Sequence, residues 1–221
     1  MRSGEYCRSR FRKRRFRWQW KDSETGGRNQ RRGGLPEERH DMYVATRMFL
    51  TKGVGQNKEK LVSFELALRA AKIASFNIVR VSSIFPPRCE IVTVRKGIKE
   101  LTPGQIVHTV LAEASTNERH RLIGASIGVA IPRNRSLFGY LSEHHSFGDD
   151  DRTTGDYAED IAAQMLATIL GVEFDVDESY NKRLDQWKLS DQIVKTRNIT
   201  QTSIGKSGVW TTVVAAAVLV P

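Results

Sequence analysis

Two adjacent serines, Ser82 and Ser83, have the setting most suggestive of chemistry in this 221-residue chain. They follow a β-branched run, 77–81, that favours an extended strand, and they precede Ile84-Phe85-Pro86-Pro87. Proline lacks a backbone N–H and restricts the residue before it, so the strand must end or bend at the serines. A hydroxyl held beside the preceding carbonyl can attack it, which makes the pair a candidate self-cleavage site. An ordinary hydrogen-bonded turn is the alternative.

The elements that must position these serines form an α+β pattern in which strands outnumber helices. Strands are predicted over 42–50, 77–81, 90–94, 105–112, 120–131, 136–143, 193–202 and 209–220. Leu61, Phe64, Leu68 and Ala71 recur at helical spacing and predict a helix of about 16 residues from Lys58, with one apolar face. Gly53-Val54-Gly55 precedes this helix. A second helix is predicted over 156–170 with Gly171 as its C-cap, and 175–188 fits either a short helix or a loop.

Positive charge is concentrated at the N-terminus. Residues 1–40 contribute +8 of the formal net charge of +10. Within 10–20, cationic and aromatic residues alternate, as they do in segments that bind nucleic acids or anionic surfaces. A solvated tail, or a start codon placed ahead of Met42, would explain the same pattern. We therefore expect a basic, disordered extension over 1–41, dispensable for catalysis, and a folded domain over 42–221.

Composition excludes several classes of protein. Cys7 and Cys89 are the only cysteines, too few for a disulfide framework or a cysteine-rich metal site, and they indicate a reducing compartment. The longest uncharged apolar stretch, 213–220, is shorter than the roughly 20 residues that a membrane helix needs. His144 and His145 would point to opposite faces of a strand, which argues against a metal site. We expect a cytoplasmic protein that holds no metal and has no membrane segment.

Three further segments give the serine pair its context. Residues 77–87 resemble the processing site of the pyruvoyl-dependent arginine decarboxylases, where a run of the type Asn-Leu-Ile-Arg-Ile-Ser-Ser-Ile-Met-Pro-Pro is cut between its serines. Upstream, 61–68 resembles the substrate-pocket helix of that family, and downstream 131–143 resembles the segment that ends in its catalytic glutamate. The alanine-rich run 210–219 is similar to the family's last strand. The resemblance extends from about Thr51 to the C-terminus.

This resemblance implies a layered αββα sandwich, assembled as a trimer of αβ units or a multiple of it, with each active site at a subunit interface. It implies a cut that leaves a β chain ending at Ser82 and an α chain starting at position 83. Ser83 would become a pyruvoyl group, so that neither pyridoxal phosphate nor a metal is needed. Such a group forms a Schiff base with an amino-acid substrate and accepts electrons as CO2 leaves.

The resemblance also assigns roles to individual residues. Glu143 corresponds to the proton donor, Asn77 to the asparagine that assists processing, and Glu65 to the carboxylate that binds the substrate side chain between Leu61 and Leu68. The family usually has aspartate at the position of Glu65; glutamate keeps the charge for guanidinium pairing but reaches one methylene further.

The implied reaction converts L-arginine to agmatine and CO2. Apart from further copies of the chain, the expected partner is this small-molecule substrate, and nucleic acid is expected only through the basic extension. One alternative is the same chemistry on another basic amino acid. The other is a nucleic-acid-binding protein that uses the basic extension on an inactive decarboxylase-like scaffold.

Overall fold

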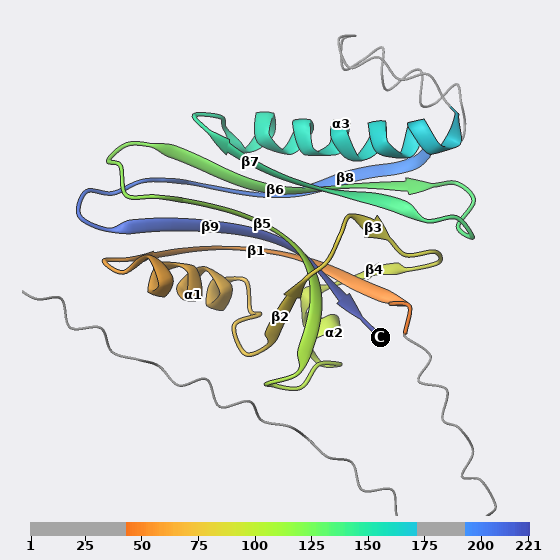
Figure 1. The fold of residues 1–221 in the computed structure, drawn as a ribbon, viewed down its shortest axis with the longest axis horizontal. Helices are drawn as coiled ribbons and strands as arrows, with labels where there is room; N and C mark the ends of the chain where they lie inside the picture. The colour runs from red at the N-terminus through yellow and green to blue at the C-terminus, as the bar shows by residue number, and fades with distance from the viewer. Residues whose placement is uncertain (1–42, 172–192) are drawn as a thin grey trace, which may run out of the picture. The chain divides into compact units, whose positions relative to one another are not determined.

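Two stacked β-sheets with helices on their outer faces form the folded unit (Figure 1). The computed structural model describes residues 43–171 and 193–221. The chain divides into two units, Met1–Asp41 and Met42–Pro221, and every element described below belongs to the second. Its layers follow the order helix, sheet, sheet, helix, so the predicted αββα class is confirmed.

The first sheet has five strands in the order β2-β5-β9-β1-β4. These are β1 (Arg47–Asn57), β2 (Asn77–Arg80), β4 (Glu90–Val92), β5 (Ile106–Thr116) and β9 (Trp210–Val220). Strand β9 pairs antiparallel with β1 over the full length of both. By contrast, β2 pairs with β5 over only four residues and then leaves the sheet.

The second sheet has four antiparallel strands in the order β3-β7-β6-β8. These are β3 (Ile84–Phe85), β6 (Leu122–Pro132), β7 (Gly139–Phe147) and β8 (Ile193–Ile204). Helix α3 (Asp151–Leu170) covers its outer face (Figure 1). Asp150 caps the start of α3 by accepting the Thr153 N–H at 2.8 Å, and Gly171 ends it with φ of 67°, the left-handed C-cap that was predicted.

Helix α1 (Lys60–Ala70) packs so closely on β1 that the strand has to carry glycines. A Cβ at Gly53 would lie 2.1 Å from the carbonyl oxygen of Ala67, and one at Gly55 would lie 2.1 Å from that of Ser63. The two glycines precede the helix, as the sequence indicated. They lie inside β1, and they allow the helix to approach it.

Several predicted boundaries are corrected by the structure. The first strand runs over 47–57 instead of 42–50, and α1 has 11 residues instead of about 16. Thr93 ends the predicted strand 90–94 early, because it caps a short helix, α2 (Val94–Ile98). Strand β7 extends to Phe147, and α3 begins at Asp151. The predicted region 175–188 lies outside the described residues.

Alanine-rich β9 lies between the two main apolar clusters. Val213, Ala215 and Ala217 face the other sheet, whereas Val214 and Ala216 face the α1 layer, since successive strand residues alternate. Small side chains on both faces let the neighbouring layers approach closely. This core fixes the spacing between the sheets, across which the serine pair lies.

Candidate active site

The Ser82–Ser83 peptide crosses from one sheet to the other. On one side, the Val81 N–H donates to the carbonyl oxygen of Thr109 in β5 at 3.2 Å. On the other side, the carbonyl oxygen of Ser83 accepts the Leu141 N–H of β7 at 2.7 Å. The predicted strand end at the serines is confirmed, and the peptide is held from both sheets.

The chain re-enters a ladder immediately after the serines. Ile84 pairs with Tyr140, and Phe85 pairs with Gly139, so the two prolines do not keep the residues before them out of a ladder. Phe85 is almost completely buried, so it fixes β3 against the inter-sheet core. The prolines end the strand after two residues.

The serine pair forms a tight turn. The carbonyl oxygen of Ser82 accepts the N–H of Ile84 at 3.0 Å, which closes a three-residue turn with Ser83 at its apex. Ser82 is exposed and Ser83 is half-buried. The hydrogen-bonded turn that was the alternative to chemistry is therefore present, and it involves the carbonyl that self-cleavage would attack.

Glu143 lies on the strand that receives this turn. It follows Leu141 by two residues, so both side chains are on the face of β7 directed toward the other sheet. Leu141 is buried in the inter-sheet core, whereas Glu143 is exposed where that core ends. The structure thus brings the serine turn and Glu143 to the same edge of the sandwich.

A cavity of about 390 Å³ opens at this edge. Its charged and titratable lining residues come from α1, β2, β5 and β7: Lys60, Arg80, Glu113, Glu143, His144 and His145. Arg80, two residues before Ser82, pairs with Glu113 at 2.5 Å. This ion pair holds the end of β2 against β5 just before the chain leaves the sheet.

The two histidines have different surroundings. The ring of His144 packs against Tyr157 of α3, with 4.5 Å between ring centroids. Burial lowers the pKa of His144 below its usual 6.5, the charge of His145 lowers it further, and Asp149 opposes both. Within residues 43–171 and 193–221, no group of three or more His, Cys, Asp or Glu side chains is placed to hold a metal ion.

Asn77, the predicted processing residue, lies at the opposite end of β2 from the serines. Its side-chain amide donates to the carbonyl oxygen of Gly104 at 2.7 Å. At about 3.3 Å per residue, five extended residues place it roughly 16 Å from Ser82. Asn77 therefore does not contact the serine turn of its own chain.

The predicted substrate-binding residues are on α1. Glu65 pairs with Arg69 at 2.5 Å, Leu68 packs against the core, and Leu61 is 78% exposed. The prediction that Leu61 belongs to a buried apolar stripe is wrong for this chain. None of the three lines the cavity beside Glu143, to which α1 contributes only Lys60.

Sequence reasoning missed Lys60, Arg80 and Glu113 as neighbours of Glu143. Arg80 lies inside the matched serine motif, which was a usable signal. Glu113 is 33 residues away in the chain, and no local pattern links it to Arg80.

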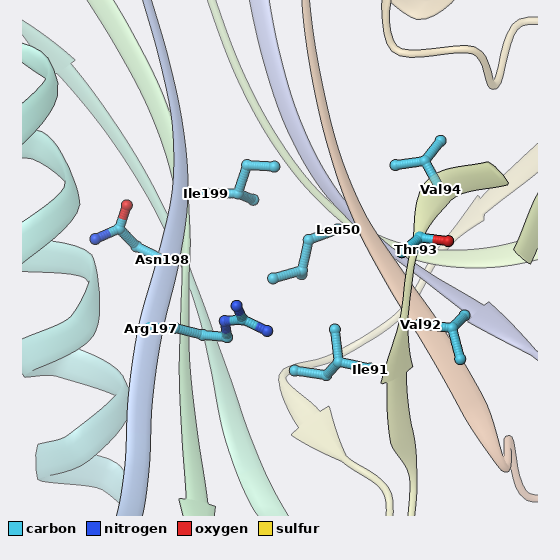
Figure 2. A pocket seen from close by; sticks show the side chains of 8 residues that line it. All are labelled: Leu50, Ile91, Val92, Thr93, Val94, Arg197, Asn198 and Ile199. Atoms are coloured by element: carbon cyan, nitrogen blue, oxygen red, sulfur yellow. The ribbon is translucent and has the colours of Figure 1, made fainter. Parts of the chain in front are cut away.

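A second cavity, of about 370 Å³, lies between β1, β4 and β8 (Figure 2). Leu50, Ile91 and Ile199 line it, and Arg197 is its one charged lining residue. In Figure 2 the Arg197 side chain extends into the space between the strands, whereas Asn198 points toward α3. Among the residues that the structure describes, this lining has no carboxylate or histidine, so these residues offer no acid or base for catalysis.

None of the helices in the described part of the chain is both long and apolar enough to cross a membrane.

Comparison with known proteins connects this site to a family. The sequence model of the pyruvoyl-dependent arginine decarboxylases (PvlArgDC) matches residues 47–221. The chain belongs to this family, as its motifs predicted. The serine turn, the self-derived cofactor that it would generate and the nearby carboxylate are the elements that such an enzyme requires.

Individual relatives align over almost their whole length. A probable pyruvoyl-dependent arginine decarboxylase of Chlorobium phaeovibrioides is 57% identical over 179 residues, which cover 81% of this chain and 99% of the relative. The pyruvoyl-dependent arginine decarboxylase of Nitrosopumilus maritimus is 51% identical over 80% of this chain and 97% of its own length. Pyruvoyl-dependent arginine decarboxylase 2 of Methanosarcina acetivorans is 53% identical, with the same coverage.

Proposed function

We propose that this protein cleaves itself between Ser82 and Ser83 and then converts L-arginine to agmatine and CO2. The observation that carries the proposal is the serine turn between the two sheets, on the strand edge that also carries Glu143. The substrate follows from the family, because the family and its relatives are named arginine decarboxylases.

Maturation starts with the Ser83 hydroxyl, which attacks the Ser82 carbonyl carbon and converts the amide into an ester. Elimination then releases the Ser82 carboxylate, and water hydrolyses the dehydroalanine at position 83, with loss of ammonia. The resulting β and α chains stay together, because β1 of the first pairs with β9 of the second over eleven residues. Cleavage therefore changes the site without dismantling the sheet.

The serine turn fits the pyruvoyl group that this family uses. The Leu141 N–H would continue to hold the carbonyl oxygen of residue 83, so the new group would stay beside β7. When present, the group supplies an electron sink for the loss of CO2 from the amino acid. Glu143 then delivers one proton to the α-carbon of the product, in agreement with the one proton that each turnover consumes.

The guanidinium group of the substrate binds Glu65, between Leu61 and Leu68, of a neighbouring copy. Support comes from the exposure of Leu61, from the partial exposure of Glu65, and from their absence from the cavity lining of their own chain. Among the described residues, β5 beyond Thr109 and β7 beyond Leu141 pair on one side only, so the site lies at an open sheet edge. We propose a trimer, or a multiple of it, that closes this edge.

Two roles rest on the family resemblance alone. Asn77 assists processing by fixing the start of β2 to the turn at Gly104, or by contact with a neighbouring copy. The basic extension over 1–41 is dispensable for turnover, since the family match begins at residue 47. A cytoplasmic location completes the proposal.

A substrate panel and a mixing experiment test this proposal. CO2 release should be fastest with L-arginine, and a panel in which lysine or ornithine ranks first would reject arginine as the substrate. Glu65→Gln and Glu143→Gln proteins should each be nearly inactive, whereas assemblies formed from both should regain part of the activity. No recovery from well-mixed assemblies would place both residues in a site made by one chain.

A further inference from the structure

We infer that Arg69 is an internal competitor of the substrate: it holds Glu65 while the site is empty and leaves when arginine binds. This inference rests on the proposed function, in which Glu65 binds the guanidinium group of the substrate. The Nε atom of Arg69 lies 2.5 Å from a carboxylate oxygen of Glu65. Arg69 carries the same guanidinium group as the substrate, so the two compete for one carboxylate.

Helix α1 brings the two side chains together. Residues four apart lie on the same helix face, and a glutamate that precedes its cation by four residues is the more stable order. Leu61, one turn earlier on this face, is 78% exposed, so the face is open to a neighbouring copy. Lys60, the other cation of α1, lies over the Trp210 ring at 5.1 Å. Arg69 is therefore the helix cation that holds Glu65.

The exposure of the pair allows it to open. The Arg69 side chain is 69% exposed and that of Glu65 is 40% exposed. Solvent screens an ion pair at such a surface position, so the closed pair is only about one to five times as populated as the open one. The substrate binds the open fraction, and its apparent affinity is reduced in proportion. Arg69 thus sets the arginine concentration at which the site fills.

The substrate can displace Arg69 because it can make the stronger contact. Arg69 donates from Nε to one carboxylate oxygen of Glu65. A free guanidinium group that approaches end-on can present two parallel N–H groups to the two oxygens, which is the stronger, bidentate arrangement. The released Arg69 side chain is already largely in solvent, so water solvates its charge and no new protein partner is required.

Arg69→Gln tests this inference, because glutamine removes the charge and keeps a polar side chain. The KM for L-arginine should fall about two- to sixfold, and kcat should stay within about twofold. The inhibition constant of agmatine should fall by the same factor as KM, since agmatine keeps the guanidinium group. Arg152→Gln is the matched control: it breaks an exposed pair of the same spacing with Asp156 on α3, and it should leave all three constants unchanged.

An unchanged KM in a folded Arg69→Gln protein would overturn the inference. A higher KM would also overturn it, because Arg69 would then orient Glu65 for the substrate instead of competing. The proposed function is tested separately by agmatine binding to the Glu65→Gln protein. Binding as tight as in the wild type would reject Glu65 as the guanidinium site, whereas weaker binding beside an unaffected Arg69→Gln protein would reject the competitor alone.

The NMR signal of the Arg69 Nε–H group in the wild-type protein gives an independent reading. It should be shifted from the position of solvated arginine while Glu65 accepts the bond. Saturation with agmatine should return it to that position. A signal that agmatine does not move would reject displacement, even if the Arg69→Gln protein failed to fold.

Discussion

The two edges of the sandwich carry cavities of similar size and opposite character. At the edge formed by β5 and β7, the residues that line a cavity of about 390 Å³ include six that are charged or titratable. At the edge formed by β4 and β8, aliphatic side chains surround about 370 Å³, with Arg197 as the one charge (Figure 2). Cavity volume therefore does not distinguish the edge that carries the serine turn from the other.

What distinguishes the edges is how the strands end. Strand β2 stops at Arg80, and β3 has only two residues, so the backbone crosses between the sheets at the serines. The parts of β5 and β7 beyond this crossing keep an accessible edge. At the other edge, Leu50 of β1 and Ile199 of β8 pack against the inter-sheet core. An early strand end thus creates the serine turn, whereas the opposite edge has a largely apolar lining.

The largest expected effect is at the serine turn. Ser83→Ala removes the nucleophile, so the protein should remain one chain and lose decarboxylation by at least about 1,000-fold. Denaturing gels and CO2 release measure the two results. Ser136→Ala, in the exposed loop before β7, should cut and turn over normally. An active Ser83→Ala protein would show that the serine turn is not what gives this edge of the sandwich its activity.

Glu143→Gln should separate maturation from turnover. The amide keeps the shape of the side chain but cannot donate the acidic proton, so the protein should be cut and should turn over 100- to 10,000-fold more slowly. Glu118→Gln, in an exposed ion pair with Arg121, is the control and should retain full activity. Near-normal turnover of the Glu143 variant would exclude it as the proton donor.

At the opposite edge, Leu50→Ala should affect stability and leave chemistry intact. Loss of a half-buried leucine that packs on the core should lower the free energy of unfolding by about 1–2 kcal/mol. Urea unfolding measures this loss, and kcat per folded protein should change less than about twofold. A large drop in kcat would mean that the two edges are coupled.

The smallest effect concerns His144, on the α3 side of the catalytic strand. Its pKa is lowered in the folded protein, so below about pH 6.5 the unfolded chain binds more protons and stability falls as pH falls. His144→Gln should therefore reduce the stability difference between pH 7.5 and pH 5.5, by under about 1 kcal/mol because the ring is partly solvated. An unchanged difference would assign the pH dependence to other groups.

Sequence reasoning predicted the elements that depend on local pattern. The strand end at the serines and the Gly171 cap were confirmed, as were the αββα layers that the family resemblance implied. It failed where partners are distant in the chain: β3 is too short for a periodic signal, and it pairs with Tyr140 and Gly139 of β7. The purpose of the glycines inside β1 was missed for the same reason, because only the packing of α1 explains them.

The site was predicted unevenly for related reasons. Ser83 and Glu143 come to one edge because neighbouring strands of the second sheet carry them, and both lay in recognisable motifs. Glu65 and Asn77 lie in motifs that are just as recognisable, yet in a single chain both residues are distant from this edge. A motif indicates a role, but it does not say which copy of the chain performs it.

The most direct test is the intact mass of the purified protein under denaturing conditions, with and without a reductant that traps ketones. We predict two chains, Met1–Ser82 and residues 83–221, the second carrying a reducible carbonyl at its N-terminus. A single uncut chain of 25.0 kDa would contradict the central claim that the serine turn between the sheets generates the cofactor.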